Sequence, residues 1–249
     1  MNITVCIKRT PDTETRVRIG DDGVSIDPAG VKYIMSPYDE MAVEAALKTT
    51  EAVGDGEVHV LTFGSPDAVE TLRSGLAMGA DSGILLTGDP TMDGLATAKV
   101  LTAELEGRSD DLVLFGVKAV DDDQQQVGPM VATLLDRPCV TAVAAFEVKD
   151  GVATCHREVE GGMEVVEVPL PAVLTVTKGE FEPRYASLKG IMAAKRKPLE
   201  QKEAADVEPR LVVDRLGLPP ARPEGRIVGE GPDAVPELVR LLREEAKVI

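Results

Sequence analysis

The sequence contains no tryptophan, and aromatic residues make up only 3% of its 249 positions. The hydrophobic content is nevertheless 43%, so Val, Leu, Ile and Ala must build the core. Such a length suits one large α/β domain, or one domain with an appendage. The three cysteines form no CxxC pair and there are only two histidines. The sequence therefore predicts neither a disulfide framework nor a metal site, and it favours a reducing, cytoplasmic compartment.

Positive charge is also scarce, since 27 basic residues face 43 acidic ones and the formal net charge is -16. A chain of this charge is repelled by phosphate backbones and anionic membrane surfaces, so we expect no nucleic-acid partner. The sequence lacks an apolar run of about 18 residues, which argues against membrane insertion. The opening residues, MNITVCIKRT, do not have the pattern of a signal peptide.

Several motifs that carry chemistry are missing. There is no GxGxxG after the first predicted strand, no GxxxxGK[ST] and no GxSxG, which removes the dinucleotide fingerprint, the P-loop and the nucleophile elbow. His59 falls within an apolar strand and His156 in a predicted hairpin strand, so both are interpreted as structural. The sequence predicts no catalytic residue in this chain.

What the sequence does contain is an alternation of short apolar runs with longer amphipathic segments. Strands are predicted at residues 3–7, 57–63, 83–87 and 111–116, separated by helices that begin after Ser36-Pro37 and Ser65-Pro66. This pattern predicts an α/β fold with a doubly wound, mostly parallel sheet. After residue 140, four strand-like runs with turns at Asp150-Gly151 and Gly161-Gly162 predict an antiparallel extension.

The C-terminal part has a different composition. Residues 179–200 are predicted to form a loop with one helical turn, and residues 201–226 a polar, proline-rich arm. A final helix over residues 234–247 carries the apolar stripe Val235, Leu238, Leu241 and Leu242. We therefore predict an α/β domain over residues 1–200 and a docking arm with its helix over residues 201–249.

Ligands of open α/β sheets bind at the carboxyl ends of the strands, where the strand order reverses. Four segments follow predicted strands or open helices: residues 6–9, 36–39, 63–65 and 121–132. The last contains DDDQQQVGP, in which glutamine side chains and the Val127 and Gly128 amides could bind phosphate while one acid caps a helix. The alternative is that the three acids only complement the helix dipole.

The segment 181–198 is the most basic part of the chain. It places Lys195, Arg196 and Lys197 next to Leu188, Ile191 and Met192. Apolar residues on an exposed loop beside positive charge favour a transient docking site for a partner protein. The alternative is a solvated surface with no partner.

The chain resembles the β subunit of electron transfer flavoproteins over essentially its whole length. The matching segments are VCIKRTPDT, VKYIMSPYDEMAVEAAL, GLAMGAD, AVDDDQQQVGPM, EVEGGMEVVEVPLPAVLTV and FEPRYASLKGIMAAKRK. The resemblance implies a fold similar to the adenine nucleotide α-hydrolase type. It also implies a heterodimer with an α subunit that holds most of the FAD, and a structural AMP in the β subunit. Electrons would come from acyl-CoA dehydrogenase-type flavoproteins of fatty acid oxidation and leave to a membrane quinone oxidoreductase.

The resemblance also assigns residues to these roles. Tyr38 matches an aromatic position near the flavin, Leu188 matches the anchor of the dehydrogenase recognition loop, and Glu164 matches a glutamate that holds the mobile flavin domain at rest. Tyr185, Ile191 and Met192 accompany Leu188 as docking residues. The implied cofactor-binding residues are Cys6, Ser36, Pro37, Tyr38, Asp39, Phe63, Asp121, Asp122, Asp123, Gln124, Gln125, Gln126, Val127, Gly128, Pro129, Met130, Val131 and Ala132.

Three departures keep alternatives open. Thr13 stands where the family often has an aromatic residue that could contact flavin, and AAKRKP is less basic than the lysine-rich segment of some members. In DDDQQQVGP, the acids resemble AMP-binding members, whereas QVGP resembles electron-bifurcating members with a second FAD at that site. A further alternative is an adenine-nucleotide sensor module that needs no α subunit.

Overall fold

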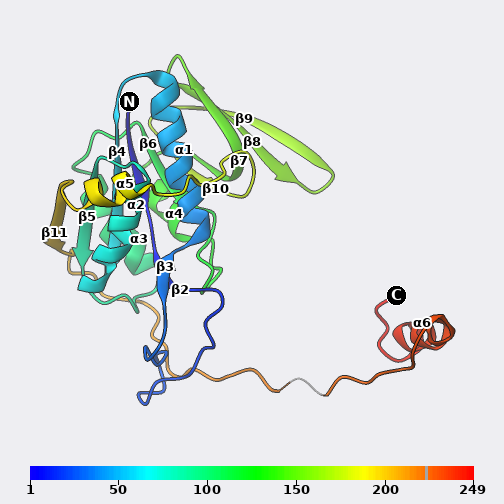
Figure 1. Cartoon of the computed structure of the whole chain (residues 1–249). Helices are drawn as coiled ribbons and strands as arrows, with labels where there is room; N and C mark the ends of the chain where they lie inside the picture. The colour runs from blue at the N-terminus through cyan, green and yellow to red at the C-terminus, as the bar shows by residue number, and fades with distance from the viewer. Residues whose placement is uncertain (222–223) are drawn as a thin grey trace. The chain divides into compact units, whose positions relative to one another are not determined.

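The structure is a computed structural model that describes residues 1–221 and 224–249. It divides into two compact units, Met1–Asp214 and Arg215–Ile249. The first unit contains the sheets and the helices that cover them (Figure 1), which confirms the predicted α/β class. This unit extends past residue 200, where the sequence placed a boundary, because a strand crosses that point.

Within the described residues, the main sheet has nine strands in the order β11-β5-β4-β1-β6-β10-β7-β8-β9. The chain moves outward from β1 through β4 to β5 and then returns to the other side of β1 at β6. The sheet is therefore doubly wound, as predicted, with its switch point between β1 and β6. The strands on this path are β1 (Asn2–Cys6), β4 (Glu57–Gly64), β5 (Ser82–Thr87) and β6 (Leu112–Gly116). A small antiparallel pair, β2 (Arg9–Pro11) with β3 (Tyr33–Met35), follows β1.

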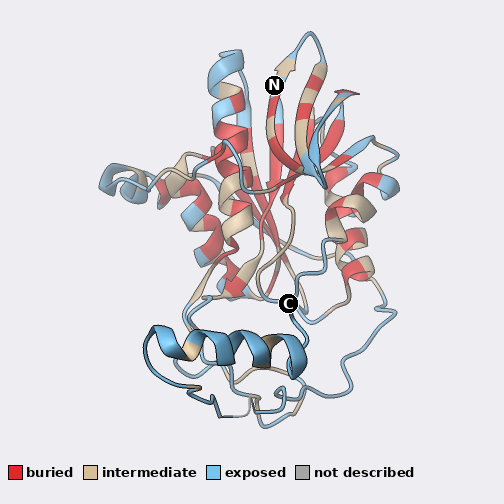
Figure 2. Ribbon diagram, turned by 90° about the vertical axis from the view of Figure 1, so that its right-hand side faces the viewer, coloured by how far each residue is buried: buried red, intermediate tan, exposed pale blue. Residues whose placement is uncertain are grey.

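Helices cover both faces of this sheet, which explains why its strands are continuous apolar runs. Successive residues of β1 point to opposite faces, so Ile3 and Val5 pack under α1 (Pro37–Val53) and α2 (Val69–Met78), in the larger core cluster. Cys6 belongs to the cluster on the other face, under α3 (Gly94–Leu105) and α4 (Val127–Leu134). Figure 2 shows the buried residues concentrated on the strands and on the inward faces of the helices.

The ends of α1 follow from its sequence. Ser36 is the N-cap residue and Pro37 occupies the first turn, where its missing N–H costs nothing. Gly54 closes the helix with φ of 83°, and its N–H donates to the Thr50 carbonyl. The Ser36 hydroxyl makes no capping bond and is instead buried, with Oγ 3.5 Å from the Lys118 carbonyl oxygen.

The predicted antiparallel extension is present, but it contains three of the four strand-like runs. β7 (Cys139–Lys149), β8 (Val152–Val159) and β9 (Gly162–Pro169) form consecutive antiparallel pairs. The fourth run, β10 (Ala172–Val176), lies between β6 and β7 and is parallel to both. Its residues are all buried, because β10 joins the central sheet, where both faces are covered.

The segment predicted as a loop with one helical turn contains more regular structure. It forms α5 (Leu188–Ala194), which packs against α2, and it leads into β11 (Leu199–Glu203). β11 pairs in parallel with β5 at one edge of the sheet. No helix in the described parts of the chain combines the length and the apolar character needed to cross a membrane.

The second unit contains η2 (Pro232–Ala234) and α6 (Val235–Glu244), close to the predicted final helix. None of the α6 residues is buried, and Val235 and Leu238 of the predicted apolar stripe are 53% and 43% exposed. On its polar side, Arg240 forms ion pairs with Glu237 and Glu244, each at 2.8 Å. The apolar side of α6 is therefore available for contact.

Candidate functional site

Asp39 connects the two strands at the switch point of the sheet. Its Oδ2 accepts a hydrogen bond from the Lys8 N–H at 2.7 Å, and its Oδ1 accepts one from the Gly116 N–H at 3.0 Å. Lys8 follows β1 and Gly116 ends β6, so one carboxylate in the first turn of α1 holds both strand ends. The predicted residues Ser36, Pro37, Tyr38 and Asp39 are thereby placed at the carboxyl ends of β1 and β6.

The electrostatic environment of Asp39 is unusual for a carboxyl group. Its side chain is buried, and this burial raises its pKa to about 7, although the Lys8 and Gly116 N–H bonds act in the opposite direction. Gly116 is required beside it, because a Cβ there would lie 2.4 Å from Asp39 Oδ1 and 2.8 Å from the Asp39 nitrogen. The sequence did not identify Gly116 as part of this site.

The three acids of DDDQQQVGP form ion pairs with Lys8, which lies in the predicted segment 6–9, and with Lys118, which the sequence did not single out. Lys8 Nζ lies 2.9 Å from Asp121 and 2.8 Å from Asp122, while Lys118 Nζ lies 2.9 Å from Asp123. The alternative of acids that serve only the helix dipole is weakened, because the first turn of α4 contains no acidic residue. The acids lie before the helix and fasten the loop to the segments that follow β1 and β6.

The loop has a backbone shape that is uncommon for its residue types. Asp123 and Gln125 have φ of 52° and 55°, in the left-handed region that non-glycine residues rarely adopt. The Gln126 side chain donates to Gln124 and lies against Gly94, where a Cβ would be 2.4 Å from Gln126 Nε2. The glutamines therefore bring the loop next to the start of α3.

α4 begins directly after this loop, at Val127. The first N–H groups of a helix have no acceptor within the helix, and they favour an anion near its N-terminus. Gly128 allows α4 to approach the sheet, because a Cβ there would lie 2.8 Å from Thr175 Cγ2 on β10. Of the remaining predicted residues here, Val131 and Ala132 are buried in the core, while Pro129 and Met130 are half-buried.

The other predicted cofactor-binding residues lie around this loop. Cys6 is buried at the end of β1, where its burial, followed by Asp110 and Asp39, raises the pKa of the thiol well above its usual value. Tyr38 lies beside Lys118, whose Nζ is 5.9 Å from the ring centroid. Phe63, near the end of β4, packs against Gly88, where a Cβ would lie 2.5 Å from its ring. Cys6 and Tyr38 therefore lie near the ends of β1 and β6 together with Asp39, whereas Phe63 lies on the neighbouring strand β4.

The predicted docking residues form an exposed apolar group around α5. Tyr185 is 100% exposed, Leu188 82%, Met192 67% and Ile191 45%. Beside them lies a groove of about 810 Å³ between α1, α2 and the segment before α5, lined by residues that include Met41, Met78 and Ile191. Glu164, the remaining predicted docking residue, is on β9 and forms an ion pair with Arg157 at 3.5 Å. No contact in the described residues joins it to the Leu188 group.

This exposed group is held on a rigid base by Arg184, which the sequence did not single out, and by Lys197, which the sequence placed in the positive part of the docking site. Arg184 forms ion pairs at 2.7 Å with both Glu44 and Glu51 of α1. Lys197 Nζ donates to one carbonyl in the last turn of α2, that of Leu76 at 3.1 Å, and to the carbonyls of the two residues after the helix, Gly79 at 2.9 Å and Ala80 at 2.6 Å. The docking segment is therefore fastened on both sides of α5.

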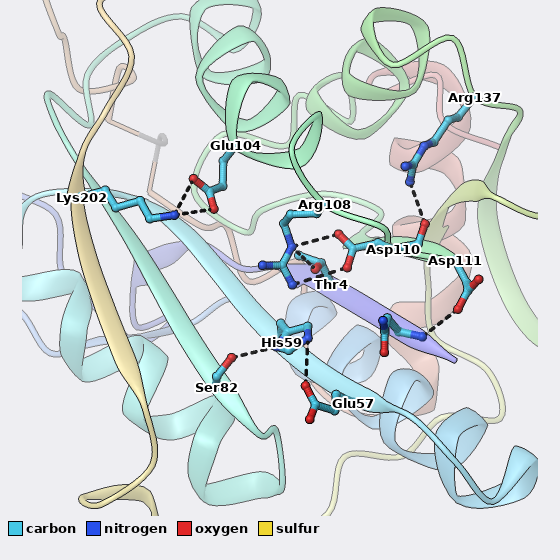
Figure 3. Close-up of polar contacts among 11 residues, drawn as sticks. Thr4, Glu57, His59, Ser82, Glu104, Arg108, Asp110, Asp111, Arg137 and Lys202 are labelled. Carbon is cyan, nitrogen blue, oxygen red and sulfur yellow. Dashed lines mark hydrogen bonds and ion pairs between the residues drawn. The ribbon is translucent and has the colours of Figure 1, made fainter.

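A second polar cluster lies at the opposite, amino end of the strands (Figure 3). Thr4, His59 and Ser82 are neighbours across β1, β4 and β5, and His59 Nδ1 is 2.7 Å from Ser82 Oγ. Arg108 contacts Thr4 at 3.2 Å and Asp110 at 3.1 Å. Burial, followed by the positive charge of Arg108, lowers the pKa of His59. These contacts agree with a structural role for this histidine.

Comparisons with known proteins point to one family. Residues 24–207 match the model of the electron transfer flavoprotein domain. Similar curated proteins include the electron transfer flavoprotein subunit beta of Syntrophomonas wolfei, 39% identical over 100% of this chain and 98% of the relative. The protein of the same name from Bradyrhizobium diazoefficiens is 40% identical, with 100% of both chains covered. The human protein of that name is 34% identical over 100% of this chain and 99% of its own.

Proposed function

This chain belongs to the electron transfer flavoprotein family as a β subunit, and from that premise we propose that it works in a heterodimeric electron carrier. The α partner would hold most of the FAD, and the flavin would supply the redox chemistry when it is bound. The role of this chain is then to position the cofactor, bind AMP as a structural component and dock the electron donor.

The AMP site that we propose is the loop from Asp121 to Gln126 together with the start of α4. The observation that carries the proposal is the pairing of Lys8 with Asp121 and Asp122 and of Lys118 with Asp123. Three free carboxylates would repel a phosphate, but here two ammonium groups pair with them and offset most of their negative charge. The N-terminal N–H groups of α4 are then the group that favours the anion.

The residues present also suit the nucleoside half of AMP. The site lies at the carboxyl ends of β1 and β6, where the strand order reverses and ligands of such sheets bind. Gln124 and Gln126 offer amide donors and acceptors, and Phe63 offers an aromatic face close to the end of β4. Tyr38 is proposed to face the flavin of the α subunit, as its position in the first turn of α1 allows.

The donor docks, in this proposal, on the group formed by Tyr185, Leu188, Ile191 and Met192. Support comes from the exposure of these four apolar side chains on a segment fastened by Arg184 and Lys197. A small apolar anchor gives specificity without a large interface, which suits a carrier that must dissociate quickly. An acyl-CoA dehydrogenase-type flavoprotein is the proposed donor, and a quinone oxidoreductase is the proposed acceptor.

The arm and α6 are proposed to dock on the α subunit. Support comes from their many exposed apolar side chains, among them Leu211, Val212 and Ile227, which are 74%, 82% and 86% exposed. Apolar exposure on this scale is typical of a surface that a partner covers. Glu164 is proposed to hold the flavin domain at rest, which would require it to exchange its ion pair with Arg157 for one with the α subunit.

The experiment that tests this function is a cofactor count. The chain is co-expressed and purified with its α subunit, the heterodimer is denatured, and AMP and FAD are quantified per heterodimer. One AMP and one FAD would support the proposal. Two FAD and no AMP would instead indicate the electron-bifurcating alternative, in which the QVGP part of the motif is the better guide. No stable partner and no flavin would indicate an adenine-nucleotide sensor.

A further inference from the structure

Asp93 uses its two carboxylate oxygens for two separate parts of the chain. Oδ1 accepts a hydrogen bond from the Ala96 N–H at 2.9 Å, which makes Asp93 the N-cap of α3. Oδ2 accepts from the Leu211 N–H at 2.9 Å and from the Arg210 N–H. Capping needs only Oδ1, so the two hydrogen bonds from Arg210 and Leu211 to Oδ2 have a purpose other than capping.

From β11 onward, the chain contacts the α/β unit at several successive points before residues 210–211 meet the Asp93 side chain. The backbone of β11 pairs with β5, and Lys202 of that strand forms an ion pair with Glu104 of α3 at 2.9 Å. The Ala204 N–H then donates to the Thr87 carbonyl at 3.0 Å, and Val207 packs against the core cluster under α3. Arg210 and Leu211 are the next attachment.

In the described part of the chain, no hydrogen bond or ion pair joins residues after Leu211 to the α/β unit. The side chains of Leu211 and Val212 are 74% and 82% exposed, and the first compact unit ends at Asp214. Within residues 1–221 and 224–249, Asp93 is thus the last group of the α/β unit that forms hydrogen bonds to the chain as it enters the arm. Asp93 accepts hydrogen bonds from backbone N–H groups and not from side chains, so it fixes the position of the main chain at residues 210–211.

We propose that Asp93 is a positioning residue that sets the point and the direction from which the arm leaves the α/β unit towards the α subunit. This inference rests on the proposed docking of the arm. An arm that is already fixed at residues 210–211 loses less conformational freedom when it binds, and binding is tighter for that reason. Asp93 would therefore slow dissociation of the heterodimer without touching the α subunit.

The charge state of Asp93 agrees with this role. Hydrogen bonds from the Ala96 and Leu211 N–H groups lower the pKa of the carboxyl to about 2. The group is ionised near neutral pH, and an ionised carboxylate is a stronger acceptor of N–H bonds than a neutral amide oxygen. The Arg210 and Leu211 N–H groups need this second charged oxygen.

Asp93→Asn separates the two roles. Asparagine is among the best N-cap residues, so its one amide oxygen can still cap α3. Its NH₂ group then replaces the oxygen that accepts from Arg210 and Leu211. The two backbone N–H groups would then face another hydrogen-bond donor, and both bonds would be lost. The matched control is Asp89→Asn, which removes the same charge four residues away. In the part of the chain that the structure describes, the Asp89 side chain accepts only within its own turn, from the Thr91 N–H at 2.9 Å and the Thr91 hydroxyl at 2.7 Å.

The test uses the purified heterodimer and measures how fast its β subunit exchanges with an excess of labelled wild-type β subunit. We expect Asp93→Asn to exchange roughly ten times faster than the wild type, since two charge-assisted hydrogen bonds are lost. Asp89→Asn should exchange at the wild-type rate. Hydrogen exchange at the amides of Arg210 and Leu211 should also be faster in Asp93→Asn, while Ala96 remains protected.

Each outcome bears on one claim. Wild-type subunit exchange in Asp93→Asn, or equal acceleration in Asp89→Asn, would overturn the positioning role of Asp93. Loss of Ala96 protection would also overturn it, because the effect would then come from α3. A third variant that ends at Asp214 tests the underlying proposal: if it exchanges as slowly as the full chain, the arm does not dock on the α subunit, whatever Asp93→Asn does.

Discussion

The clamp formed by Arg184 gives the most quantitative prediction, because its two carboxylate partners differ in burial. The Glu44 side chain is 3% exposed, whereas that of Glu51 is 58% exposed, and both lie 2.7 Å from the same guanidinium. Glu44 also accepts from the Arg184 backbone N–H at 3.2 Å. The two pairs therefore compare a buried and an exposed ion pair within one clamp.

Replacing Arg184 with methionine leaves the buried Glu44 carboxylate without its cationic partner, with only the backbone N–H of residue 184 still donating to it, which costs about 3 kcal/mol. Glu51→Gln removes only the exposed pair, and such pairs contribute less than about 1 kcal/mol. The cost of Glu44→Gln lies between these two values, at about 2 kcal/mol. A neutral amide keeps one acceptor but turns a donor towards the guanidinium.

The assay is native-state hydrogen exchange at α5, where the Ile191 N–H donates to the Ser187 carbonyl at 2.9 Å. The free energy of local opening at this amide should decrease most in Arg184→Met, less in Glu44→Gln and least in Glu51→Gln. Equal effects of the two glutamate variants would refute the reasoning from burial. An unchanged opening free energy in Arg184→Met would refute the claim that this clamp holds the docking segment.

Three further predictions concern the switch point. Gly116→Ala should destabilise the protein by about 3 kcal/mol in urea unfolding, because its Cβ would meet Asp39 at 2.4 Å; Gly162→Ala, with nothing within 4 Å, is the control and should be neutral. Lys8→Met should lower the AMP content of the purified heterodimer while it changes stability by less than about 1 kcal/mol, and Lys32→Met, which loses only the exposed pair with Asp12, should retain AMP. The raised pKa of Asp39, about 7 against an ordinary value of 3.8, means that the folded state binds more protons between these values. This contribution to stability is therefore complete below about pH 4 and is lost as pH rises through 7. Asp39→Asn should make the pH slope of the unfolding free energy less negative there, by up to about 1.4 kcal/mol per pH unit, and an unchanged slope would contradict the buried carboxyl.

The sequence predicted those elements whose signal is local. The starts of α1 and of the η1–α2 segment (η1, Pro66–Ala68) followed from Ser-Pro pairs, and the buried strands followed from continuous apolar runs. β11 was missed because LEQKE, an edge strand with a polar exposed side, resembles a loop. The position of β10 was missed because its pairing partners, β6 and β7, are not encoded in its own five residues.

The same limit applies to the site. DDDQQQVGP was recognisable as a motif, but the lysine that pairs with two of its acids lies 113 residues before Asp121. Arg184 and Glu44 are 140 residues apart, and neither residue type is unusual in its own segment. Partners of this kind become visible only when the fold brings their segments together, which is why the roles of Lys8, Lys118, Gly116 and Arg184 emerged from the structure alone.

The central claim, that this chain docks a dehydrogenase so that electrons reach the flavin, is tested most directly by rapid-mixing kinetics of flavin reduction. The heterodimer is mixed with an acyl-CoA dehydrogenase and its substrate, and the flavin absorbance is followed for the wild type and for Leu188→Ala. Our account predicts that the wild-type flavin is reduced and that Leu188→Ala slows this step about tenfold with unchanged flavin content. Equal rates in both proteins, or no reduction of the wild type by any such donor, would contradict it.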